Sequence, residues 1–163
     1  MDDLLLLSTP TDVLEETDTA PPVVASYGMA LDPGETAGLV VTIFDHQKFE
    51  LVQVGEFAYA GIIGSLSTML EDFKPKVVIC ESFRLYQHKA KAQIHSSFPT
   101  VEMIGMLKAV CWLNGLDDPI MQSPTCKGNV NILPRHRLTV GSSPHVQDAY
   151  RHFRYWWITE YRS

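Results

Sequence analysis

Three carboxylates in this sequence stand at positions that local structure does not fully explain. Asp32 ends an apolar run, Glu81 directly follows the run 77–80, and Asp148 comes three residues after His145. A carboxylate at the end of a buried strand is unfavourable unless it is paired or binds a cation. If the two strands are neighbours, Asp32 and Glu81 converge at the edge where open sheets bind ligands. Oxygen donors with one or two imidazoles suit Mg²⁺ or Mn²⁺ better than a closed zinc site.

Each carboxylate also has a simpler explanation. Asp32 precedes Pro-Gly and could nucleate a turn through its side chain. Glu81 could cap the segment that follows it or pair with Arg84. Asp148 could interact favourably with the N-terminus of its helix. The metal-site interpretation therefore depends on the three residues coming together.

The last predicted helix has two distinct faces. One is an apolar stripe that would pack on a sheet, formed by Val146, Ala149, Phe153, Trp156 and Trp157. The neighbouring face carries His145, Asp148 and His152 at positions i, i+3 and i+7. Docking of the stripe would bring His145 and Asp148 towards the two strand ends. We interpret His152 as a histidine on the helix surface.

The apolar pattern predicts the elements that would position these side chains. Five runs predict strands, at residues 23–31, 38–44, 49–57, 77–80 and 120–122. Helical spacing predicts three helices, at residues 62–73, 100–113 and 143–161. Ser143 suits the N-cap of the last helix and Pro144 its first position. Residues 82–97 are interpreted as a loop or the start of a loosely held helix, and residues 127–143 as a loop. The order predicts a mixed sheet, with three antiparallel strands first and helices packed on it.

Length and charge set the outer limits. The chain has 163 residues, enough for one domain with a sizeable core. We expect a disordered acidic tail over residues 1–24 and one folded domain over residues 25–163. Residues 1–82 carry three basic against fourteen acidic side chains, whereas residues 83–163 carry ten against five. A basic half can mark a polyanion-binding surface, although an uneven solvated surface is the plainer explanation.

The sequence shows neither a membrane span nor a secretory signal, and together with its cysteine pattern this predicts a cytoplasmic protein. The longest apolar run near the start, residues 4–7, is far shorter than the about 20 residues of a membrane span. Asp2 and Asp3 stand where a secretory signal would be basic. The three cysteines form no CxxC pair, so we expect reduced thiols rather than a disulfide framework or a zinc site.

Three motifs carry a resemblance to a known family. MALDPGETAGLVV (residues 29–41), VVICESF (77–83) and SPHVQDAYRHF (143–153) resemble the motifs of the RuvC-type Holliday junction resolvases. The resemblance covers residues 25–160, and it departs in one place, where Thr36-Ala37-Gly38 makes the first turn one residue longer. It implies the RNase H-like fold of that superfamily, with a mixed five-stranded sheet and helices on both faces. The chain looks most like small resolvases encoded by bacteriophages.

The resemblance also implies roles. Asp32, Glu81 and Asp148 would be metal-binding catalytic carboxylates, and His145 would be a fourth ligand or the residue that orients or deprotonates the attacking water. The implied cofactor is a pair of Mg²⁺ ions, for which Mn²⁺ can substitute. The implied reaction is hydrolysis of phosphodiester bonds in four-way junctions, leaving 5′-phosphate and 3′-hydroxyl ends. The implied assembly is a homodimer, since two opposed strands must be cut.

Basic and aromatic residues near the motifs are candidate DNA contacts. The candidates for phosphate contacts are Arg84, Lys89, Lys91, Lys127, Arg135 and Arg137. Phe83 and Tyr86 could stack on unpaired bases, although Phe83 could equally belong to the core. An apolar stripe on the middle helix could serve either a dimer or the core, and it comprises Met103, Ile104, Met106, Leu107 and Val110.

Three other functions remain open. The first is a nuclease of the same fold that cuts flaps, forks or RNA–DNA hybrids. The second is a branched-DNA-binding module without catalysis, which would need a broken set of acids. The third is an actin-like sugar kinase, because Asp32–Thr36 also matches a phosphate-loop pattern. The kinase would need a second lobe, for which the chain has no room.

Overall fold

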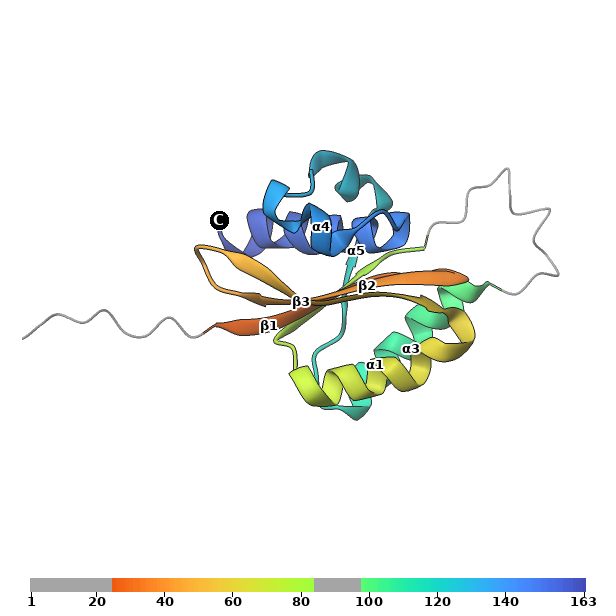
Figure 1. The fold of residues 1–163 in the computed structure, drawn as a ribbon. Helices are drawn as coiled ribbons and strands as arrows, with labels where there is room; N and C mark the ends of the chain where they lie inside the picture. The colour runs from red at the N-terminus through yellow and green to blue at the C-terminus, as the bar shows by residue number, and fades with distance from the viewer. Residues whose placement is uncertain (1–24, 84–97) are drawn as a thin grey trace, which may run out of the picture.

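The protein contains a five-stranded mixed sheet with strand order β3-β2-β1-β4-β5 (Figure 1). The computed structural model describes residues 25–83 and 98–163, so the predicted tail over 1–24 lies outside the described residues. The strands are β1 (Ser26–Asp32), β2 (Thr36–Phe44), β3 (Phe49–Ala58), β4 (Val77–Glu81) and β5 (Ile120–Gln122). β1 and β3 run antiparallel to β2, whereas β4 runs parallel to both β1 and β5. The predicted mixed sheet is confirmed.

Short local signals form the hairpin between β2 and β3. Asp45 accepts hydrogen bonds from the backbone N–H groups of Gln47 (2.7 Å) and Lys48 (2.8 Å). Such side-chain bonds are a common way for aspartate to stabilise a turn. The predicted connection over residues 45–48 is therefore confirmed, and β2 and β3 pair along nearly their whole length.

Helices cover the two faces of the sheet (Figure 1). α1 (Tyr59–Phe73) and α3 (Pro99–Leu113) pack on one face, and α5 (Pro144–Trp156) packs on the other. The first face buries Met103 and Leu107, with Ile104, Met106 and Val110 partly buried beside them. The stripe predicted on the middle helix therefore belongs to the core.

The ends of the main helices agree with the sequence signals. The Ser143 hydroxyl accepts a hydrogen bond from the backbone N–H of Val146, which confirms the predicted N-cap of α5. The apolar stripe of α5 packs into the second core cluster, also as predicted. The helix continues as a π-helical turn, η4 (Trp157–Tyr161). α1 begins three residues earlier than predicted and ends before Pro75, with Lys74 in the left-handed region (φ 43°).

The segment predicted as a loop over residues 127–143 contains short helices. They are the 3₁₀ helices η2 (Pro124–Asn129) and η3 (Pro134–His136) and the one-turn helix α4 (Arg137–Val140). Proline stands at the start of η2 and η3, where its fixed φ favours a helical turn. The prediction of an irregular loop was therefore wrong in detail. Among the described residues, no helix has the length and apolar character needed to cross a membrane.

Candidate active site

Two neighbouring strands place Asp32 and Glu81 side by side. β1 and β4 are parallel, and Leu31 pairs with Cys80, so the next residue on each strand is a carboxylate. Successive side chains of a strand point to opposite faces. Leu31 and Cys80 belong to the core beneath α1 and α3, so Asp32 and Glu81 point to the face covered by α5. The predicted convergence of the two carboxylates is confirmed in the structure.

A glycine lets the start of α5 reach these carboxylates. Gly38 pairs with Asp32 across the β1–β2 ladder. A Cβ at this position would lie 2.0 Å from the carbonyl carbon of His145, a separation that real atoms do not adopt. Only glycine therefore allows the backbone of α5 to approach this closely. Close packing of α5 on the sheet therefore explains why the DPGETAG motif ends in glycine.

His145 contacts Asp32 at this point of closest approach. Its Nδ1 lies 3.0 Å from Asp32 Oδ2, and the Asp32 side chain is only 11% exposed. Burial raises the pKa of Asp32 above its ordinary value, the hydrogen bond to His145 opposes this, and the negative charges of Glu81 and Asp148 add to the rise. Asp32, the last residue of β1 before the turn, thus accepts a hydrogen bond from His145 of α5.

Lys127 joins the other two carboxylates. Its Nζ lies 2.8 Å from Glu81 Oε2 and 2.6 Å from Asp148 Oδ2. The other oxygen of Asp148 accepts from Arg151 Nη1 at 2.7 Å. Burial disfavours the charged ammonium, but the hydrogen bonds to Asp148 and Glu81 outweigh it and raise the pKa of Lys127. We predicted Lys127 as a phosphate contact on a loop, and the structure instead places it on η2 between two carboxylates.

His152 lies inside the site, so its interpretation as a helix-surface histidine was wrong. The side chain is fully buried, with Nε2 2.8 Å from Glu81 Oε2 and Nδ1 2.8 Å from Gln122 Oε1. Burial by itself raises the pKa of Glu81, but the hydrogen bonds from His152 and Lys127 outweigh it and hold that pKa below its ordinary value. The signal was the shared helix face with His145 and Asp148. This shared face did not by itself predict a buried position, because a histidine on a helix is more often at the surface.

These residues fit a divalent cation in charge and donor type. Asp32, Glu81 and Asp148 come from β1, β4 and α5, and burial raises the pKa of Asp32 with smaller contributions from the charges of the other two. The ammonium of Lys127 holds a positive charge between two of them. Within residues 25–83 and 98–163, however, no three His, Cys, Asp or Glu side chains are grouped as a metal site would require. Lys127 lies between Glu81 and Asp148, so its ammonium would have to move for a metal ion to bind both carboxylates.

The other predicted DNA contacts are more scattered. Arg135 lies 3.6 Å from Glu50 and donates to the Phe49 carbonyl, at the start of β3. Arg137 lines a separate cavity. Phe83 is 38% exposed and packs edge-to-face on Phe98, so it is not a core residue. The remaining candidates lie outside the described residues, namely Arg84, Tyr86, Lys89 and Lys91.

Comparison with known proteins shows which fold this is. No family model matches the sequence, and no curated protein matches it in sequence. Among solved structures, the RuvC of Thermus thermophilus in complex with a Holliday junction substrate superposes with a TM-score of 0.60 at 15% identity, covering 83% of this chain and 96% of that one. The fowlpox virus Holliday junction resolvase gives 0.58 at 12% identity (82% and 99%), and the yeast mitochondrial Holliday junction resolvase gives 0.51 at 12% (83% and 81%). The chain therefore has the RNase H-like fold of the RuvC-type structures, over nearly the whole length of each of the first two.

Proposed function

We propose that the protein is a metal-dependent, structure-specific endodeoxyribonuclease that cleaves Holliday junctions and other branched DNA. The observation that carries this proposal is that Asp32 and Glu81 end neighbouring parallel strands on the face covered by α5, where Lys127 joins Glu81 to Asp148 of that helix. The similar structures include the fowlpox virus and yeast mitochondrial Holliday junction resolvases and a RuvC in complex with a Holliday junction substrate. The reaction would hydrolyse a phosphodiester bond and leave 5′-phosphate and 3′-hydroxyl ends.

The three carboxylates would hold the divalent cations, with Mg²⁺ as the expected metal and Mn²⁺ as a substitute. Such ions supply a nucleophilic hydroxide at neutral pH and stabilise the charge on the leaving oxygen. Glu81 is already oriented by His152, and Asp148 by Arg151. Fixed side chains of this kind keep ligands in place without reorganisation during the reaction. The residues beside the carboxylates therefore support the proposed role as much as the carboxylates do.

His145 would move a proton in the proposed reaction. Because a carboxylate only accepts hydrogen bonds, the contact with Asp32 puts a hydrogen on Nδ1 of His145. In a neutral ring this leaves Nε2 free to accept a proton from an attacking water. The side chain is 38% exposed, so solvent and substrate can reach it. We propose His145 as a water-orienting base rather than a firm metal ligand.

The proposal includes a homodimer, since resolution of a junction requires cuts in two strands. α3 exposes large apolar side chains that a second copy could cover, namely Val101, Trp112 and Leu113. Trp112 is 76% exposed, which is unusual for a side chain of this size. The same helix faces the core with its other side. Sedimentation of the purified protein with and without Trp112→Gln tests this part separately.

One observation favours a second candidate function. Lys127 already neutralises Glu81 and Asp148, as it would in a branched-DNA-binding module that has no need of a metal. The two functions differ in one outcome, because a binding module shifts junction DNA in a gel but never cuts it.

The deciding experiment measures cleavage of a labelled four-way junction beside matched linear duplex, flap and RNA–DNA hybrid controls. Mg²⁺, Mn²⁺ and EDTA are compared, and Asp32→Asn is set against Asp72→Asn, an exposed carboxylate on α1. Paired nicks that need metal and disappear only in Asp32→Asn support the proposal. Equal cutting of flaps or hybrids replaces it with a broader nuclease, and binding without cutting in any metal supports the second candidate.

A further inference from the structure

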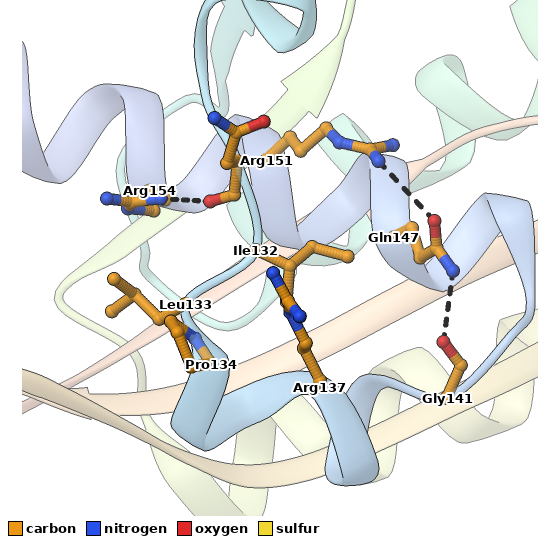
Figure 2. A pocket seen from close by; sticks show the side chains of 9 residues that line it. Ile132, Leu133, Pro134, Arg137, Gly141, Gln147, Arg151 and Arg154 are labelled. Carbon is orange, nitrogen blue, oxygen red and sulfur yellow. Dashed lines mark hydrogen bonds between the residues drawn. The ribbon is translucent and has the colours of Figure 1, made fainter.

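An arginine-lined cavity lies between α5 and the segment 131–141 (Figure 2). It has a volume of about 730 Å³ and is bounded by α5, α4 and the segment between η2 and η3. Three arginines line it: Arg137 from α4, and Arg151 and Arg154 from α5. The lining residues that the structure describes include no acidic side chain. We define this cavity, by its three arginines, as the arginine pocket.

The arginine pocket uses a third face of α5. Gln147, Arg151 and Arg154 stand at i, i+4 and i+7, so they share one side of the helix. This side is distinct from the apolar stripe on the sheet and from the face that carries His145, Asp148 and His152. One helix thus divides its surface between the core, the candidate active site and the arginine pocket.

Hydrogen bonds shape the walls of the pocket. The Gln147 amide donates to the Gly141 carbonyl at 3.0 Å, and Arg154 donates to the Asn131 carbonyl (Figure 2). These bonds tie the turn after α4 and the segment before η3 to α5. The guanidinium of Arg137 lies across from Arg151 between these walls (Figure 2). The pocket is therefore built by the fold and does not depend on an exposed loop alone.

The charges in the pocket point to an anionic ligand. Of the three arginines, only Arg151 forms an ion pair within residues 25–83 and 98–163. Guanidinium groups present planar, paired donors that match the oxygens of a phosphate. Three of them around one cavity repel one another unless an anion lies between them. Phosphate is thus the chemistry that the arginine pocket fits best.

Two observations favour a phosphate of DNA over a free nucleotide. The lining holds no aromatic side chain among the described residues, so a separate base would have no ring to stack on. Arg151 also links the pocket to the candidate active site, because its guanidinium donates to Asp148 at 2.7 Å. Arg151 therefore belongs to both sites, so a strand bound at Asp148 would lie near one wall of the pocket.

We propose that the arginine pocket binds backbone phosphates of the DNA strand that passes the carboxylate cluster, with Arg137 and Arg154, the two arginines without an ion pair among the described residues, as its phosphate-binding groups. This inference rests on the proposed function. Arg137, which the sequence predicted as a phosphate contact, is thereby assigned to the arginine pocket. Arg151 and Arg154 are added to the candidate DNA contacts, although the sequence did not single them out.

The test measures binding of a fluorescent four-way junction in EDTA, where no cleavage occurs, over a series of NaCl concentrations. The variants are Arg137→Gln, Arg154→Lys and the double variant R137Q/R154Q, with Arg162→Gln as control. Arg162 is exposed and lies over the Trp157 ring, away from the pocket lining. Arg137 is exposed, so its substitution leaves the fold intact, and the melting temperature of each variant is measured alongside.

We expect the affinity of the double variant for the junction to fall by about tenfold or more, because each arginine–phosphate bond is charge-assisted. The slope of log K against log salt should also fall by about 1 to 2, since fewer counterions are released. Arg154→Lys should lose part of the affinity while keeping the charge, because lysine lacks the paired donors. Arg162→Gln should bind as the unmodified protein does.

Other outcomes overturn the proposal in distinguishable ways. If the double variant binds the junction as tightly as the unmodified protein, and the unmodified protein cleaves junctions, the arginine pocket is not a DNA site and the proposed function stands. If the unmodified protein binds no DNA at all, the proposed function fails, and the inference fails with it. Calorimetry with inorganic phosphate and deoxyadenosine monophosphate gives a further arm. Tight binding of either that is lost in the double variant, with DNA binding unchanged, replaces the DNA strand by a free phosphate compound.

Discussion

Gly38 and His145 meet backbone to backbone, with so little space that a Cβ on Gly38 would stand 2.0 Å from the His145 carbonyl carbon. The contact brings the start of α5 over the end of the β1–β2 hairpin, where Asp32 pairs with Gly38. It therefore sets the position of His145 relative to Asp32. The candidate active site depends on this glycine as well as on its charged residues.

Gly38→Ala should destabilise the protein and weaken activity together. Overfilling a packed site typically lowers the free energy of unfolding by about 1–3 kcal/mol. Here the added Cβ would meet backbone atoms of His145, which move less easily than a side chain. Urea denaturation measures the loss. Gly64→Ala is the matched control, because a Cβ there meets nothing within 4 Å, and alanine inside a helix should add about 0.5–1 kcal/mol. Equal stability of Gly38→Ala and the unmodified protein would contradict the close approach.

Lys127→Gln should have opposite effects without and with Mg²⁺. Without metal the variant loses two charge-assisted hydrogen bonds, to Glu81 and Asp148, and its free energy of unfolding should fall by about 1–3 kcal/mol. With Mg²⁺ the freed carboxylates have no competing ammonium, so the metal should raise its melting temperature more than that of the unmodified protein. Thermal melts over a Mg²⁺ titration measure both effects. Lys108→Gln, an exposed lysine on α3, is the control, and identical Mg²⁺ shifts in both variants would contradict competition at this site.

His152 and Gln122 should be energetically coupled. His152→Ala removes a fully buried ring, leaves Gln122 Oε1 without its partner and leaves Glu81 with Lys127 alone, so we expect a loss of about 2–4 kcal/mol. A double-mutant cycle with Gln122→Ala should show a coupling of about 0.5–3 kcal/mol. His46→Gln, on an exposed histidine, should change stability little. Additive losses would mean that the two side chains act independently.

The same pair defines a protonation question that spectroscopy can answer. Glu81 only accepts, so His152 carries a hydrogen on Nε2. If Gln122 Oε1 faces Nδ1, both ring nitrogens have to donate, which only the imidazolium form can do. The buried Nε2 of Gln122 has no hydrogen-bond partner, and exchanging the two ends of its amide would pair that nitrogen with a neutral ring. Nitrogen NMR of His152 distinguishes the two forms, and we expect the same answer in Asp72→Asn, which lies on the other face of the sheet.

Asp32→Asn should be more stable than the unmodified protein at neutral pH in EDTA. Burial raises the pKa of Asp32, so the folded protein binds more protons than the unfolded chain, and this residue lowers stability as pH rises through its raised pKa. Asparagine removes that penalty, and the advantage should shrink as the pH falls below the ordinary pKa of an aspartate, where both states hold the proton. Thermal melts from pH 3.5 to 8 measure it. A destabilised Asp32→Asn at every pH would show that the contact with His145 outweighs burial.

Much of the site follows from the sequence because its placement is local. The alternation of side chains along β1 and β4, with a carboxylate one residue beyond each apolar run, is enough to put Asp32 and Glu81 on one face. Ser143 and Pro144 set the start of α5, and helical spacing puts His145 and Asp148 on one side of it. Backbone geometry alone determines these relationships once the elements form.

The tertiary structure decides what lies across from these residues. Lys127 is 21 residues from Asp148 and 46 from Glu81 along the chain, and only the path of the short helices between β5 and α5 brings its ammonium between them. The arginine pocket depends on the same segment folding back over α5, whereas His152 is buried where α5 packs against Glu81 of β4 and Gln122 of β5. No local spacing encodes such contacts, because they arise where distant elements pack. The amino-acid pattern therefore determined the sheet, the main helices and the acids, whereas the packing of residues 123–143 decided which cations face them.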